Sequence, residues 1–220
     1  GLRYLPEVRF STPVGEQFAF DAEASVNAVL STDVRERACS LAARLKPYRG
    51  FVRLSSARFE ARAGPQKINF GSAILLRPLM WFDRVGPRDP LELTDGVYGL
   101  LGRYYFQNNA NIWAWGLLGN SAPKGWEVHG SERWTPEPGA RVQVPVPRGE
   151  IAATFYHRRA VVPPDSVRAT ETPVDEDRVG LDGKWDVGVG CWLEAALARS
   201  RVHTPVLSET WQRAATLGVD

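Results

Sequence analysis

The stretch of residues 18–31 alternates between apolar side chains and side chains that are almost all polar or small. The apolar positions of this stretch are Phe18, Phe20, Ala22, Ala24, Val26, Ala28 and Leu30. Successive side chains of a β-strand point to opposite faces of the sheet, whereas a helix would scatter each set around its circumference. The pattern therefore predicts one long strand with an apolar face and a polar face.

The same period of two recurs along the chain and predicts an antiparallel, all-β fold. Residues 38–45 also alternate, but their Ala and Leu content would equally suit a helix. Residues 97–118 form the plainest hairpin, with a polar tip at 107–111. Further strands are expected at residues 4–12, 51–63, 66–70, 141–147, 151–159, 185–197 and 211–219. No helix is predicted with certainty, and we expect one domain over residues 1–220.

Turns and loops are predicted where Gly, Pro and polar residues gather. Gly64-Pro65 and Arg148-Gly149 indicate tight turns. Residues 74–95 fit neither a strand nor a helix period, and their aromatic content favours a long, ordered inserted loop. A polar, Pro-rich stretch at residues 163–178 is expected to be a second long loop.

Alternation alone does not tell which face meets water. In a soluble β-sandwich the apolar face points into a core, and in an outer-membrane barrel it points to lipid. Fourteen residues extend about 46 Å, which at a 45° tilt is enough to cross a bilayer core, whereas sandwich strands are commonly about five or six residues long. Short turns alternate with long connections, and aromatic residues cluster near strand ends as in interfacial girdles. These clusters are Tyr104, Tyr105, Phe106, Trp113, Trp115, Phe155 and Tyr156.

Several runs of the chain carry a resemblance to a known group. They are QKINFG at residues 66–71, RPLMWFD at 77–83, PRDPL at 87–91 and GLDGKWDVG at 180–188. These runs resemble porin-like bacterial outer-membrane proteins, including alginate-export-like barrels, although Gly86 replaces the acidic or amide residue of their loop motif. The resemblance implies an antiparallel up-and-down transmembrane β-barrel in the bacterial outer membrane. Because both ends of the chain look cut, we expect a fragment of a larger barrel.

The basic residues are uneven in type, with 4 Lys against 23 Arg among a total of 27. A GC-rich genome would explain this bias, and a pore wall studded with guanidinium groups is the functional alternative. The net charge of +2 gives no basic footprint for nucleic acid, so no nucleic-acid partner is expected.

No catalytic or metal-binding constellation is recognisable. Cys39 and Cys191 lie far apart, and none of the three His residues has metal-ligand spacing. Glu194 could be imagined as an acid–base partner of His157, but a carboxylate facing a lumen explains it better. We therefore expect no metal, no cofactor and no enzymatic activity.

The polar strand faces and the inserted loop supply the candidate functional residues. A pore wall is predicted from Arg58, Glu60, Arg62, Lys67, Asn69 and Arg103. If the loop folds into the lumen, its charges would narrow the pore and set charge selectivity; these charges are Asp83, Arg84, Arg88, Asp89, Glu92 and Asp95. The alternative is an extramembrane turn held by Asp–Arg pairs.

The function expected from these observations is passive passage of small hydrophilic solutes through a water-filled barrel. Its partners would be outer-membrane lipid and the solute, and no oligomeric state is predicted. The alternative is a soluble or surface-attached β-sandwich that binds carbohydrate, with Trp81, Trp126 or Trp134 as stacking platforms. The outward or inward direction of the apolar face separates the two.

Overall fold

The computed structural model describes residues 2–35, 38–83, 94, 96–164, 170–202 and 208–219, with side chains of 33–39 left aside. Every long regular element in these residues is a β-strand, as the alternation predicts. The strands are β1 (Leu2–Tyr4), β2 (Glu7–Val14), β3 (Phe18–Arg35), β4 (Ala38–Ser55), β5 (Phe59–Gln66), β6 (Val97–Tyr105), β7 (Asn111–Leu117), β8 (Glu137–Val146), β9 (Gly149–Val162), β10 (Thr172–Asp186), β11 (Gly190–Val202) and β12 (Ser208–Val219).

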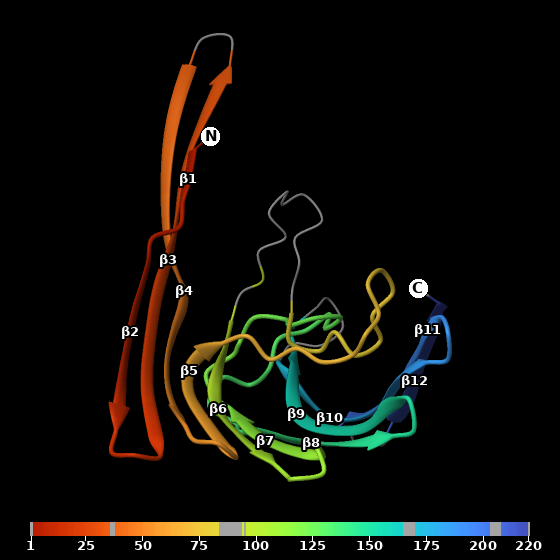
Figure 1. Cartoon of the computed structure of the whole chain (residues 1–220). Helices are drawn as coiled ribbons and strands as arrows, with labels where there is room; N and C mark the ends of the chain where they lie inside the picture. The colour runs from red at the N-terminus through yellow and green to blue at the C-terminus, as the bar shows by residue number, and fades with distance from the viewer. Residues whose placement is uncertain are drawn as a thin grey trace.

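All strands belong to one 12-stranded antiparallel sheet in which chain neighbours pair in order from β3 to β12. Both β1 and β2 pair with β3. Figure 1 shows that the sheet curves into an open trough, with the long β3–β4 hairpin rising at one margin. The predicted all-β, antiparallel, up-and-down fold is confirmed, and the sheet does not close on itself within the described strands.

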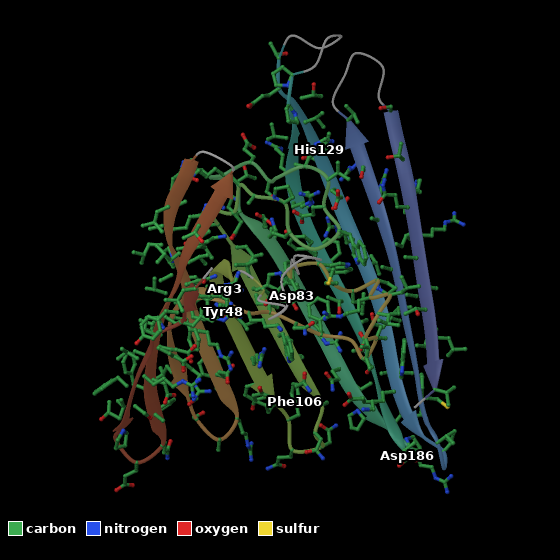
Figure 2. The ribbon with its side chains drawn as sticks, turned by 90° about the horizontal axis from the view of Figure 1, so that it is seen from above. Arg3, Tyr48, Asp83, Phe106, His129 and Asp186 are labelled. Atoms are coloured by element: carbon green, nitrogen blue, oxygen red, sulfur yellow. The ribbon has the colours of Figure 1, made fainter. Side chains whose placement is uncertain are left out.

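Connections of different length lie at the two ends of the strands. The short ones are residues 15–17, 56–58, 106–110, 147–148 and 187–189, and the long ones include 118–136 and 67–96, of which the structure describes 67–83, 94 and 96. Phe106 and Asp186 lie at one end of the sheet and His129 lies toward the other (Figure 2). Asn109 and Arg148 have positive φ, which tight turns require. One end of the sheet, which we call the short-turn rim, therefore has only short turns, and the opposite rim carries the long connections.

Three strand boundaries differ from the expectation. Gly64 and Pro65 lie inside β5, where they pair with β6, so the chain leaves the sheet only after Gln66. Residues 66–70 do not form the expected separate strand. The expected loop at 163–178 is shorter than predicted, because β10 begins at Thr172. The charged residues at the start of β10 form ion pairs with β9, so this polar segment is strand and not loop. The ambiguous residues 38–45 are strand.

The concave face of the trough is covered by two long connections, which fill its middle in Figure 1. We call residues 67–96 the first inner loop, described over 67–83, 94 and 96, and residues 118–136 the second inner loop. The hydrophobic core lies between these loops and β6–β9, and comprises Ile68, Phe70, Leu79, Trp81, Phe82, Val97, Leu101, Trp115, Leu117 and Tyr156. Trp115 and Tyr156, expected in a girdle, are thus buried on the inside, because the loops pack over them.

The convex face carries the opposite set of alternate residues, and these are apolar and exposed. Paired residues share a face, so Ile151, Val179 and Leu193 lie on the side away from the loops. Exposed apolar side chains also extend over β2–β4 and β6–β8, and include Val8, Phe10, Phe18, Leu30, Val52, Leu54, Leu100, Ile112 and Val142. No second sheet covers this face among the described residues, so the sandwich alternative is wrong for this chain.

Charged rows limit the convex apolar belt on β9–β12. Phe155 and Val179 face each other on the convex side, and the next cross-strand pair on that side is His157 with Asp177, whose side chains lie 2.7 Å apart. The row after that pairs Arg159 with Asp175 at 3.0 Å. The convex face therefore changes from apolar to ionised within one step along the strands, toward the rim that carries the long connections.

Candidate functional site

The first inner loop lies on the concave face through an aromatic cluster. The Phe70 ring stacks on Trp115 at 6.0 Å between centroids, and Trp81 stacks on Tyr156 at 6.1 Å. Phe82 meets the Tyr156 ring edge-on at 4.9 Å. Aromatic pairs of this geometry add to the hydrophobic gain of burial, so the loop is a packed part of the interior.

A buried carboxylate on the wall holds the backbone of the same loop. Glu194 on β11 is fully buried and accepts hydrogen bonds from the N–H groups of Ala73 (2.6 Å) and Leu79 (3.4 Å). A Cβ at Gly71 would lie 2.3 Å from Glu194 Oε1, so the loop approaches this closely only because residue 71 is glycine. Glu194 faces the interior as predicted, and the strand register places His157 on the opposite face.

The second inner loop is held by a buried Lys. The Lys124 ammonium lies 3.0 Å from Glu137 Oε2 and 3.5 Å from Glu127 Oε2, and it donates to Ser131 Oγ at 2.9 Å. The Tyr156 hydroxyl donates to the same oxygen of Glu137. Loop and wall are therefore joined by charge-assisted hydrogen bonds, which are stronger than neutral ones.

Two guanidinium groups of the wall complete this cluster. Arg158 lies 3.1 Å from Glu127 and 3.0 Å from Glu176, and Arg178 pairs with the same two carboxylates. We call the six charged residues the anchoring network: Lys124, Glu127, Glu137, Arg158, Glu176 and Arg178. Burial raises the pKa of Glu127, and the three nearby cations oppose that rise. The network holds equal numbers of cationic and anionic groups.

The two inner loops also contact each other. Trp126 Nε1 donates to the carbonyl of Arg77 at 2.7 Å. Gly125 has φ +49°, and a Cβ there would collide with the Met80 carbonyl. The loops therefore form one insert that projects over the concave face rather than two independent flaps.

A cavity of about 760 Å³ remains between this insert and β9–β12. Trp81 and Trp126 line it from the insert, and Ala196, Ser200 and Gln212 line it from the wall. Its size falls within the range of pockets that hold small molecules.

The other side of the concave face carries exposed and half-buried charges. Glu60 lies 2.9 Å from Arg62, 3.6 Å from Arg103 and 3.9 Å from Arg53, and Arg53 lies 2.8 Å from Asp21. We call these five residues the charge ladder. Glu60, Arg62 and Arg103 therefore lie on the wall where the sequence places them. The sequence analysis missed Asp21 and Arg53, although their positions in the alternation could have found them.

The remaining predicted wall residues lie elsewhere. Arg58 is in the exposed turn 56–58, outside any strand, so its assignment to the wall is corrected. Lys67 and Asn69 follow the end of β5 and belong to the first inner loop. Gln66, the last residue of β5, is buried, and its side chain donates to the Gly99 carbonyl at 3.1 Å.

Lys67 and, through Arg77, Asn69 lie close to Asp83, which is the one residue of the predicted constriction that the structure describes. Asp83 Oδ2 lies 3.7 Å from Lys67 Nζ and 3.8 Å from Arg77, which also donates to Asn69. Burial raises the pKa of Asp83, while Lys67 and Arg77 act in the opposite direction. The other members lie outside the described residues, so their role stays a prediction; they are Arg84, Arg88, Asp89, Glu92 and Asp95.

Two further searches of the described residues gave no site. No group of three or more His, Cys, Asp or Glu in that part of the chain is placed to hold a metal ion. No helix in the same residues is long and apolar enough to cross a membrane. Cys191 carries a free thiol, and the Cys39 side chain is not described.

The comparisons with known proteins lead to outer-membrane structures. No family model matches the chain, and no curated protein matches it. The structure is similar to that of OmpT (in-vitro folded), an outer membrane protein of Vibrio cholerae, with 11% identity, a TM-score of 0.46 and coverage of 99% of this chain and 79% of that chain. It is also similar to OmpTdeltaL8, a loop L8 deletion mutant of OmpT, with 11% identity, a TM-score of 0.47 and coverage of 99% and 85%.

These findings bear on three expectations. The expected location, the bacterial outer membrane, agrees with both descriptions. The narrower resemblance to alginate-export-like barrels gains no support. The expectation that the chain is not an enzyme is corrected: the similar structures are described as OmpT, an outer membrane protein, and the exclusion of an enzymatic activity is withdrawn.

Proposed function

We propose that this chain forms the wall of a water-filled β-barrel in a bacterial outer membrane, and that small hydrophilic solutes pass along its concave face. The observation that carries the proposal is the segregation of the two faces. Below its charged rows the convex face is apolar and exposed, whereas the concave face carries the charge ladder on β3–β6 and the anchoring network on β8–β10.

The dimensions of the strands fit a bilayer. β9, β10 and β11 contain 14, 15 and 13 residues. At roughly 3.3 Å per residue and a tilt of about 45°, such strands rise about 30–35 Å in all, and the charged rows at His157–Asp177 and Arg159–Asp175 take up part of this height on the convex face. A convex apolar belt that stops at paired charges is also what a boundary between lipid tails and polar headgroups favours.

The ladder suits the inner wall of an aqueous passage. Arg53, Arg62 and Arg103 outnumber Asp21 and Glu60, so this part of the wall has an excess of positive charge. Guanidinium groups stay ionised and bind anions through a fixed fork of donors. Rings or rows of fixed charge set selectivity in channels, and here they favour anions.

Conductance of the purified full chain in a planar lipid bilayer tests the proposal. We expect stepwise ohmic currents from protein that partitions into detergent and migrates on a gel in a heat-modifiable way. A folded, detergent-soluble protein that gives no current in bilayers, and no swelling of sugar-loaded liposomes, would refute passage. Protein that stays in the aqueous phase as a monodisperse species would refute the membrane location.

A further inference from the structure

The cavity between the insert and β9–β12 has an aromatic side. Trp126 has 58% of its surface exposed although its Nε1 is engaged by the Arg77 carbonyl at 2.7 Å. The hydrogen bond fixes the edge of the indole and leaves its face open to the cavity. Trp81, buried to 3% exposure, lines the cavity from the same insert. A large apolar ring is thus held in one orientation before any ligand arrives.

The opposite side of the cavity is made mostly of small, uncharged side chains, although Leu197 and Arg213, which pair with each other across β11 and β12, also line it. The small side chains come from alternate positions of β11 and β12 and are Ala196, Ala198, Ser200, Gln212 and Ala214. Small side chains leave room for a flat ring to lie between the strands and the indole. Gln212 and Ser200 add neutral donors and acceptors along that wall.

The base of the cavity carries two carboxylates and two guanidinium groups that pair with one another. Glu127, Arg158, Glu176 and Arg178 line it, and each guanidinium already contacts both carboxylates. Arg77, which lies 3.8 Å from Asp83, and Arg213 also line the cavity. An anionic ligand would have to compete with carboxylates that occupy the guanidinium groups. Hydroxyl groups need no such competition, because they donate to free carboxylate lone pairs and accept from remaining N–H groups.

We propose that this cavity is a binding site for a neutral carbohydrate of one or two rings, whose apolar ring face stacks on Trp126 and whose hydroxyls bond to Glu176, Arg178 and Gln212. The cavity volume of about 760 Å³ accommodates such a solute. This inference rests on the proposed function, since it gives the passage a preferred solute class. An indole face against one side of a ring and charged hydrogen-bonding groups at its rim together select a ring that is both apolar on its face and hydroxylated at its edge.

Isothermal titration calorimetry on the full chain in detergent measures binding without requiring conduction. Maltose is the neutral probe, and glucuronate is the anionic one. We expect maltose to bind, and Trp126→Ala to weaken its binding about tenfold, the effect of losing one aromatic partner. Trp126→Phe should keep most of the affinity. Trp134→Ala is the matched control, because Trp134 is an exposed residue of the same loop that does not line the cavity.

The outcomes separate this inference from the proposed function. Maltose binding that falls in Trp126→Ala and not in Trp134→Ala supports the site, even if no current is seen in bilayers. Normal currents without maltose binding overturn the site and leave the passage standing. Equal loss in both variants, or glucuronate binding far more tightly than maltose, overturns the assignment to a neutral sugar at Trp126.

Discussion

The two halves of the concave face use charge in different surroundings. On β3–β6 the ladder is open, and the side chains of Arg53 and Asp21 are 35% and 21% exposed. On β8–β10 the anchoring network is covered by the second inner loop, and the side chains of Lys124 and Arg158 are only 6% and 3% exposed. The same residue types thus face water on one side and a packed loop on the other.

The difference in solvent exposure predicts different roles for the charge ladder and the anchoring network. Exposed ion pairs contribute little to stability, typically about 0–1 kcal/mol, because water screens them. A buried pair that loses one partner leaves an uncompensated charge, which costs about 3–5 kcal/mol. We therefore expect the network to control whether the insert stays in place and the ladder to control which ions pass.

Removing the buried Lys should have the largest effect. Lys124→Met leaves Glu127 and Glu137 without their shared cation, so we expect a loss of about 3–5 kcal/mol of stability. Urea unfolding in detergent, followed by tryptophan fluorescence, measures it. Lys124→Met combined with Glu137→Gln should recover part of the loss. Equal stability of Lys124→Met and the parent would show that the network does not hold the insert.

Releasing the first inner loop should come next. Glu194→Ala leaves the N–H groups of Ala73 and Leu79 without an acceptor, at about 1–3 kcal/mol each. The loop should then leave the wall, and single-channel conductance should rise. Glu150→Ala is the control, because this carboxylate is exposed on β9 and accepts a hydrogen bond from the Gln143 side chain instead of holding a loop. A conductance that stays unchanged in Glu194→Ala argues against an insert that narrows the passage.

The alternation of the sequence predicts faces well, because burial on one side of a sheet depends on parity alone. It therefore places Glu60, Arg62 and Arg103 on the inner wall. It does not predict where a strand ends, because the alternation continues through Gln66 into Lys67 and Asn69 although β5 ends at Gln66. For that reason Lys67 moves from the predicted wall to the loop.

The sequence does not predict the anchoring network either, for a different reason. Its members come from the second inner loop and from β8, β9 and β10, and nothing in their spacing shows that Lys124 meets Glu137 and Glu127 meets Arg178. The polar run before Arg178 resembles a loop in sequence because charged residues occupy both faces of the strand there. Only the pairing of the strands shows that each charge has a partner.

The raised pKa of Asp83 gives the insert a pH dependence. A carboxyl whose folded-state pKa is raised above 3.8 binds its proton more tightly when folded, so stability is greatest at low pH and falls as pH rises from 3.8 through the raised pKa. Fluorescence-monitored melting across that window should show the fall, and Asp83→Asn should flatten it. A fall of the same size in Asp83→Asn would trace it to another group.

The smallest effect on stability and the clearest effect on transport should come from the ladder. Arg62→Gln with Arg103→Gln removes two cations whose side chains are 20% and 15% exposed. We expect a loss of about 1–2 kcal/mol, part of it from the Arg103 guanidinium stacked 3.8 Å from the Trp113 ring centre. The reversal potential in a salt gradient should shift toward cation preference, because the wall loses its excess positive charge. Arg159→Gln on the convex face removes a charge of the same kind outside the passage and should leave the potential unchanged. If both variants shift it equally, the current follows overall charge rather than this wall; if only the double variant shifts it, ions pass the ladder on the concave side.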